Sequence, residues 1–179
     1  MYYDPDGHKP KWWQWAISGL EVVGGIVLCF VPGWQATGAT LIGMGAGSMI
    51  NGYINESNGS FDGGWWGGQV GGLVCGEVSL IPGIGSLLSA PLGTFLGSIT
   101  TDIIDCDFDG IDLEKAIYSG MIAWGISIFP STVGELLGKV NTPGNFLINT
   151  YNSIIAGIAN SVVNVFWRGK NNGKQILPM

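Results

Sequence analysis

Long apolar segments without charged side chains alternate with short polar segments along this chain. Four stretches, 22–55, 78–101, 116–134 and 140–167, contain no Asp, Glu, Lys or Arg. A helix that crosses the hydrocarbon core of a bilayer needs roughly 20 mostly apolar residues, and each stretch meets or approaches that length. The pattern therefore indicates a membrane-active or helix-packing module and argues against an ordinary enzyme.

Three proline-containing corners divide the apolar segments. They are Val31-Pro32-Gly33, Ile81-Pro82-Gly83 and Phe129-Pro130-Ser131, and polar linkers at 55–62 and 105–112 separate the hairpins that these corners define. Proline cannot continue a helix, so each corner predicts a turn between two helices. The sequence predicts an all-α fold in which three consecutive Gly-rich hydrophobic helical hairpins pack as one bundle. The expected helices lie near 12–30, 36–55, 64–80, 85–104, 112–128 and 145–167, with a short piece around 132–140.

Polar ends flank the hydrophobic region. We expect residues 1–11 to be a leader, residues 12–168 to form the helical-hairpin domain, and residues 169–179 to be a polar tail. The start of the chain lacks a basic segment followed by an apolar core, so we expect no signal peptide. There are 7 Lys and Arg against 13 Asp and Glu. This balance argues against nucleic acid as a partner, because phosphate contacts need basic side chains.

Glycines recur at four-residue spacing within the predicted helices. This spacing places small residues on one helix face and lets a neighbouring backbone approach closely, as in transmembrane helix pairs. The same spacing also suits close packing inside a water-soluble bundle, and the sequence leaves both interpretations open. The predicted helix-packing positions are Gly43, Gly47, Gly68, Gly72, Gly76, Gly93 and Gly97.

The predicted last helix carries an uncharged polar stripe. Its asparagines fall within an arc of about 120° when successive residues are placed 100° apart. A polar stripe opposite an apolar one suits a helix that lines an aqueous path or bonds its amides to neighbours. A surface helix whose polar side meets water would show the same pattern. The candidate pore-lining residues are Asn145, Asn149, Asn152, Asn160 and Asn164.

Tryptophans stand beside basic residues at both ends of the hydrophobic region. Trp12, Trp13 and Trp15 follow two lysines near the start, and Trp167 directly precedes Arg168. Tryptophan and basic residues at the ends of apolar segments are typical of a membrane interface. The four tryptophans are therefore candidate interface anchors, and the edge of a tryptophan-rich core is the alternative interpretation.

Residues that could carry catalysis are scarce. The one histidine, His8, has no nucleophile motif nearby, and the chain contains no Walker loop, GxSxG or HExxH motif. We therefore expect no catalytic residue and no cofactor.

An acidic cluster at 105–112 is the one candidate for metal binding. Asp105, Asp107 and Asp109, followed by glycine, reproduce the opening of a calcium loop. Ala116 stands where that loop needs a bidentate glutamate, so we expect no metal. We therefore interpret the cluster as an acidic linker between hairpins, in which Asp112 caps the helix that begins at Leu113.

Phrases spread along the chain resemble one known kind of protein. Residues Tyr3-Asp4-Pro5-Asp6-Gly7 look like the YDPxG element that closes an RHS-repeat core. The segments 79–85 (SLIPGIG), 92–98 (LGTFLGS) and 110–116 (GIDLEKA) resemble the Gly-rich hydrophobic pre-toxin regions that follow such cores in bacterial polymorphic toxins. The likeness extends over residues 12–137. Several members are cut by their own core at this junction; the core is absent here, so the aspartates imply a junction and no catalytic pair.

The resemblance implies a secreted or delivered effector of interbacterial competition that acts at the membrane of a target cell. Its implied partners are a lipid bilayer, a cognate immunity protein, and an upstream RHS shell or secretion apparatus, with a homo-oligomer in the membrane as a further expectation. An enzyme often follows the hydrophobic region in this family, but the 42 residues after Leu137 are too few for one. We predict a pore-forming or depolarising toxin domain. The alternatives are a non-enzymatic translocation or packing module and an unrecognised small enzyme.

Overall fold

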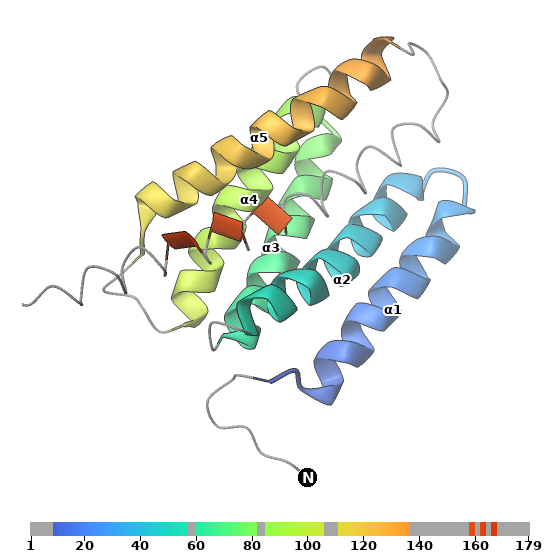
Figure 1. The fold of residues 1–179 in the computed structure, drawn as a ribbon. Coiled ribbons are helices and arrows are strands. Elements are labelled where there is room, and N and C mark those ends of the chain that lie inside the picture. Colours follow the sequence, from blue (N-terminus) through green and yellow to red (C-terminus); the bar gives the residue numbers. More distant parts are fainter. Residues whose placement is uncertain are drawn as a thin grey trace, which may run out of the picture.

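In the computed structural model, the described residues form five α-helices that lie side by side in chain order (Figure 1). The structure describes residues 9–56, 60–81, 85–105 and 111–136, together with 158–159, 162–163 and 166–167. Strands are absent from this part of the chain, so the prediction of one all-α bundle is confirmed. The helices are α1 (Trp12–Cys29), α2 (Gln35–Glu56), α3 (Phe61–Ser79), α4 (Gly85–Ile104) and α5 (Leu113–Leu136).

Successive helices run in opposite directions, and each packs on the helix before it (Figure 1). The central helix α3 makes the most extensive contacts, with α2 on one side and α4 on the other. The end of the bundle where α1, α3 and α5 begin is called here the linker end, and the opposite end is the turn end. This alternation places both polar linkers at the linker end.

The first corner forms a tight turn at the turn end. Gly33 has φ of +87°, a left-handed conformation that glycine adopts without the steric cost met by other residues. The next helix begins at Gln35. In the second corner, residues 82–84 lie outside the described residues.

The prediction of a third corner at Phe129-Pro130-Ser131 is wrong, because α5 continues through Pro130 to Leu136. The expected end near 128 and the separate piece around 132–140 therefore do not exist as predicted. A proline removes one backbone donor and one helical hydrogen bond, but its φ of about −65° is compatible with a helix on both sides. Pro91 likewise lies inside α4. Of the predicted helix 145–167, the structure describes residues 158–159, 162–163 and 166–167, which are helical.

Glycines bring the backbones of the three middle helices into contact. A Cβ on Gly68 of α3 would lie 2.4 Å from Ser48 Cα of α2, which is closer than real Cβ atoms approach. On the other side of α3, a Cβ on Gly67 would lie 2.6 Å from the Gly97 carbonyl oxygen of α4, and the reverse contact is also 2.6 Å. Side chains larger than hydrogen cannot occupy these positions without moving a helix.

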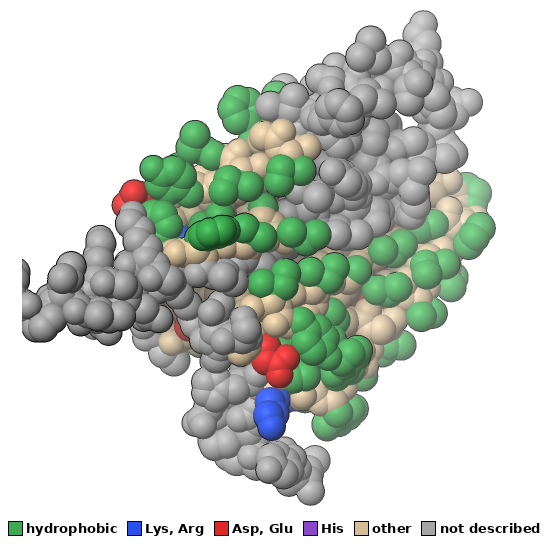
Figure 2. All heavy atoms as spheres, viewed as in Figure 1, with side chains coloured by type: hydrophobic (Ala, Val, Ile, Leu, Met, Phe, Trp, Pro, Cys, Tyr) green, Lys and Arg blue, Asp and Glu red, His purple; other side chains and the backbone are tan. Residues whose placement is uncertain are grey.

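Large apolar side chains lie mainly on the outside of the bundle. Leu20 of α1 is 73% exposed, whereas the buried apolar residues include several alanines such as Ala39, Ala90 and Ala123. Figure 2 shows apolar side chains along α1 and α5, with the charged atoms on this face near the linker end. Two large aromatic side chains, Phe61 and Trp65, are fully buried. The bundle therefore has a core of small and polar residues inside an apolar exterior.

Replacing Gly68 by alanine is expected to lower the free energy of unfolding by about 1–3 kcal/mol, because the added methyl group forces α2 and α3 apart. Gly19→Ala on α1 is the matched control. No atom lies within 4 Å of a Cβ there, so alanine should raise stability by up to about 1 kcal/mol through its helix propensity. Chemical denaturation in mild detergent, followed by far-UV circular dichroism, measures both. Equal effects would contradict the backbone contact between α2 and α3.

Candidate functional site

Helix α1 turns a polar face toward its neighbours. Gln14, Ser18 and Glu21 recur at intervals of four and three residues, which places them on one side of the helix. Gln14 and Ser18 are buried, whereas Trp12 and Leu20 are more than two-thirds exposed. A soluble helix normally shows the reverse arrangement, with its apolar stripe toward the core. The polar residues between α1, α2 and α3 are therefore the candidate site, and are called here the polar line.

At the linker end, the polar line begins with a charged cluster. Asp62 at the start of α3 accepts from two groups: the Lys11 ammonium, 2.5 Å from Oδ2, and the Gln14 amide, 2.7 Å from Oδ1. The Gln14 side-chain oxygen in turn accepts the backbone N–H of Lys11 at 2.7 Å. The ion pair is partly exposed, with side-chain exposures of 38% and 22%. The cluster thereby ties the beginning of α1 to the beginning of α3.

Deeper in the bundle, hydroxyl groups form a directed chain of hydrogen bonds. The indole N–H of Trp65 donates to Ser18 Oγ at 3.0 Å, and the Ser18 and Ser48 hydroxyl oxygens lie 3.1 Å apart. Ser48 donates to the Gly45 carbonyl oxygen at 3.1 Å. Because Ser48 uses its proton there, the shared contact is made by Ser18 donating to Ser48. Each of the three helices contributes one side chain to this chain.

The polar line continues to an acid at the level of the middle of α1. Gln69 of α3 is buried and donates from its amide nitrogen to Glu21 Oε2 at 2.7 Å and to Ser48 Oγ at 3.2 Å. The amide therefore joins α1 and α2 through α3. Glu21 is half-buried, and it directs its carboxylate toward this amide instead of the apolar exterior.

Two asparagines of α2 hydrogen-bond near the linker end. Asn51 donates to the Gly64 carbonyl oxygen of α3 at 2.7 Å. Asn55 donates to the carbonyl and side-chain oxygens of Asn51, at 2.8 and 2.9 Å. Both side chains are fully buried. A buried amide donor without a partner would be strongly unfavourable, so the bond from Asn51 to α3 also helps to align α2 with α3.

A second polar cluster connects α4 to α5. The Lys115 ammonium pairs with Asp102, and both side chains are only 9% exposed. Asp112 Oδ1 accepts the Lys115 backbone N–H at 3.0 Å, which confirms the prediction that Asp112 caps this helix. Its other oxygen accepts the indole N–H of Trp167. The described C-terminal residues are thereby held against α5, and the buried Ala159 adds a contact with Ala90 and Ala123.

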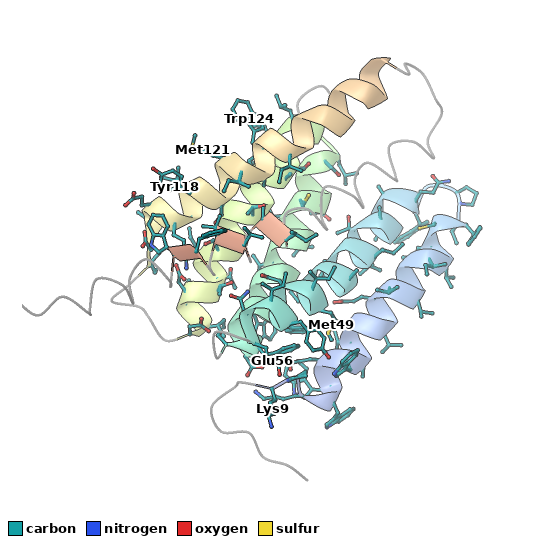
Figure 3. The ribbon with its side chains drawn as sticks, in the orientation of Figure 1. Lys9, Met49, Glu56, Tyr118, Met121 and Trp124 are labelled. Carbon is teal, nitrogen blue, oxygen red and sulfur yellow. The ribbon has the colours of Figure 1, made fainter. Side chains whose placement is uncertain are left out.

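An apolar groove lies on the outer surface between α4 and α5. Its volume is about 320 Å³, and side chains such as Leu92, Phe95, Ile117 and Met121 line it. Tyr118, Met121 and Trp124 project from the outer side of α5, while Lys9 and Glu56 lie at the linker end (Figure 3). The groove carries almost no polar surface, so it offers an acyl chain or another apolar group a place to lie and offers a polar substrate no hydrogen bonds.

The predicted helix-packing glycines are all buried between helices. Gly68, Gly72 and Gly76 face α2, whereas Gly93 and Gly97 face α3. The remaining two, Gly43 and Gly47, are in α2, and the carbonyl carbon of Gly47 would lie 3.1 Å from a Cβ on Gly68. The structure thus brings the three groups of glycines to one pair of adjoining interfaces.

The four candidate anchor tryptophans separate into two pairs. Trp12 and Trp15 are 71% and 51% exposed. Trp13 instead packs edge-to-face against Trp65, with ring centroids 5.3 Å apart, and Trp167 contacts Asp112 and lies 5.7 Å from the Tyr118 ring. Only the first pair is presented to the surroundings as an interface anchor would be.

Several predicted positions lie outside the described residues. They include the whole asparagine stripe, His8, and Asp107 and Asp109 of the acidic cluster. Asp105 is described, and it accepts a hydrogen bond from Ser60. Within the described ranges, no group of three or more His, Cys, Asp or Glu side chains lies together where it could hold a metal ion. The candidate asparagine, pore and calcium positions stay predictions.

Sequence reasoning missed the polar line. One usable signal was the spacing of Gln14, Ser18 and Glu21 opposite the exposed apolar residues of α1, which indicates a helix with its polar face inward. The partners Asp62 and Gln69 are 48 residues away in each case, and no local pattern connects them. Comparison with known proteins found no match: no protein-family model, curated protein or solved structure matches the chain.

Removing Asp102 from its buried ion pair with Lys115 is expected to lower the free energy of unfolding far more than breaking the partly exposed pair of Lys11 and Asp62. Asp102→Ala leaves the Lys115 ammonium buried and should lower the free energy of unfolding by about 3–5 kcal/mol. Lys11→Ala breaks the partly exposed pair with Asp62 and should cost at most about 1 kcal/mol. Denaturation followed by circular dichroism compares the two.

The double variant Asp102→Ala/Lys115→Met serves as the control, because it removes the stranded charge. It should recover most of the stability lost by Asp102→Ala alone. A loss for Asp102→Ala no larger than that for Lys11→Ala would show that Lys115 reaches water in solution.

Proposed function

We propose that this domain works inside a lipid bilayer, as the membrane-active toxin domain of an RHS-type bacterial polymorphic toxin. The observation that carries the proposal is the inverted distribution of side chains, with hydrogen-bonded polar groups between helices and large apolar groups outside. In water, exposed apolar surface is unfavourable by roughly 25 cal/mol per Å², and large apolar patches promote association. In hydrocarbon, the same arrangement keeps polar groups among their partners and presents apolar groups to lipid.

The lengths of the helices fit the thickness of a lipid bilayer. At 1.5 Å per residue, helices of 18 to 24 residues are about 27–36 Å long, against a hydrocarbon core of about 30 Å. Among the described residues, the helical windows Trp12–Cys29 and Leu87–Ile104 are long and apolar enough to cross a membrane. Core helices of soluble proteins share those two properties but are mostly buried, whereas 17% of the Trp12–Cys29 window and 44% of the Leu87–Ile104 window are buried in the bundle.

The interior chemistry also fits a membrane protein. In bilayers, helices associate through small residues and interhelical hydrogen bonds, because lipid removes the hydrophobic drive between helices. The glycine contacts around α3 and the polar line supply both features. Ionisable residues within a membrane normally face the bundle interior and find a partner. Glu21 with Gln69, and Asp102 with Lys115, follow that rule.

The finer architecture in this proposal is three hairpins: α1–α2, α3–α4, and α5 with the C-terminal segment. Because the backbones of α2, α3 and α4 are in contact, a water-filled path does not fit between them. A pore would instead be lined by the asparagine stripe of the last segment, or would form between several copies. An immunity protein in the producing cell and an upstream RHS shell complete the proposed set of partners.

A non-enzymatic translocation or packing module is the second candidate function. The backbone contacts around α3 favour it, since a solid glycine-packed bundle suits a scaffold better than a channel. In this case the domain would bind membrane and help a neighbouring domain cross, without itself conducting ions.

A lysine on the outer face of α1 is expected to prevent membrane partitioning. Leu20→Lys should lower the bound fraction at least about tenfold in phosphatidylcholine vesicles, because lysine is strongly unfavourable near the centre of the hydrocarbon. Ile111→Lys, at the linker end where the side chain is 37% exposed, adds the same charge and should change binding less than about twofold. Vesicle co-sedimentation provides the measurement. Unchanged binding by Leu20→Lys would mean that this face of α1 meets water.

Dye release separates the two candidate functions. The purified wild-type protein should release dye from anionic liposomes at pH 7 or pH 5, and Asn149→Leu/Asn152→Leu/Asn160→Leu should bind without releasing it, since the polar wall is lost. Binding without release by the wild type would favour the translocation module. Absence of binding at both pH values would contradict both membrane functions.

A further inference from the structure

The turn between α1 and α2 forms an uncharged apolar tip. Phe30 is 84% exposed, Trp34 54% and Val31 38%. No charged residue occurs anywhere from 22 to 55, so the hairpin from the middle of α1 to the last turn of α2 is free of ions. The α3–α4 turn differs, because Glu77 lies in the last turn of α3 and is exposed. Of these two turns, the α1–α2 tip therefore has the lower barrier to entering hydrocarbon.

Three backbone N–H groups of this tip are hydrogen-bonded within the turn. The N–H groups of residues 30, 31 and 34 donate to carbonyl oxygens three residues earlier, at 3.0–3.1 Å. Pro32 has no N–H, and Gly33 makes the reversal with φ of +87°. Unpaired backbone groups are what normally keep loops out of the hydrocarbon region. The three bonds lower that penalty for this turn without removing it.

The two helices behind the tip are closely packed, and the acid in the middle of α1 faces α3. A Cβ on Gly25 would lie 2.6 Å from the Gly38 carbonyl oxygen, so α1 and α2 are in backbone contact just below the turn. Glu21 is hydrogen-bonded toward α3 through Gln69. Lipid would therefore meet apolar side chains along the outer face of α1, with the carboxylate turned away from it.

The opposite end of the hairpin has the features of a membrane interface. Lys9, Lys11 and Glu56 lie at the linker end, and the Trp15 and Tyr53 rings pack against each other there with centroids 5.7 Å apart. Aromatic and basic residues are typical of the boundary between lipid and water. Helix α1 has 18 residues, so its beginning lies about 27 Å from the tip, which is close to the thickness of the hydrocarbon core.

We propose that the α1–α2 hairpin enters the bilayer tip first and spans it, with the Phe30–Trp34 turn at the far side and the linker end retained on the side of entry. The proposal rests on the membrane function proposed above, and adds which hairpin leads and which way it faces. Lipid is the partner that an exposed, uncharged and apolar tip fits.

Position-specific fluorescence tests this orientation. The full chain carries Cys29→Ser, Cys75→Ala and Cys106→Ser to remove native thiols, and circular dichroism checks its helix content. A single thiol is then introduced by Phe30→Cys at the tip or by Glu114→Cys at the exposed start of α5, and is labelled with the fluorophore NBD. Protein is added to preformed vesicles of phosphatidylcholine and phosphatidylglycerol, followed by external dithionite, an ion that bleaches NBD and does not cross lipid.

The label at position 30 is expected to bleach at least about tenfold more slowly than the label at position 114, because hydrocarbon excludes dithionite. Equal, fast bleaching of both labels on vesicle-bound protein would overturn tip-first insertion and leave membrane binding intact. Faster bleaching at position 30 would overturn the orientation. Failure of both labelled proteins and of the unlabelled wild type to co-sediment with vesicles would overturn the membrane function itself.

A charge placed on the tip should slow its insertion, and the rate of insertion therefore gives a second test of the proposal. Trp34→Lys should slow protection of the label at position 30 by roughly a hundredfold, because the ammonium must pass through the hydrocarbon. Ile111→Lys, at the end that stays behind, should leave that rate unchanged. Equal rates for the two variants would show that the tip does not cross.

Discussion

Direct contact between helix backbones is the constraint on which the rest of this structure depends. Along α3, one row of glycines touches α2 and another touches α4, and neither interface has space for a Cβ at these positions. Large side chains are therefore excluded from most of the interior, with Phe61 and Trp65 at the linker end as exceptions. The apolar residues that ordinarily form a core have only the outside to occupy. The apolar exterior is thus a geometric consequence of the glycine contacts.

Small polar side chains occupy interior positions from which large apolar side chains are excluded. Serine, threonine and asparagine are small enough to lie between closely packed helices, and they bring hydrogen bonds that dispersion forces alone do not supply. In a medium of low dielectric constant such bonds are strong, and incomplete ones are strongly unfavourable. The chain from Trp65 through Ser18 and Ser48 to the Gly45 carbonyl gives each donor an acceptor. Alignment of the three helices follows from that pairing.

Much of the helical architecture could be predicted from local sequence, and most of the polar site could not. Charge-free runs and the corner at Pro32 locate α1 and α2 to within a few residues, because both act through neighbouring residues. Pro130 misled the prediction, since a single proline permits helix on both sides when the surrounding residues favour it. The pairing of Asp62 with Lys11 depends on which helices become neighbours, and that information lies in tertiary packing. The spacing of Gln14, Ser18 and Glu21 indicates that they share one face of α1. In the sequence, however, they look like isolated polar residues within a hydrophobic segment.

The order of the helices in space has a consequence for how the chain folds. Each helix packs chiefly on its neighbours in the sequence, so few pairings must wait for distant segments. Chains of this kind form their contacts early and quickly. A chain that folds from its first helix onward adds one helix at a time to the growing bundle, in the order in which the helices appear. The topology therefore allows stepwise assembly while the later helices are still unfolded.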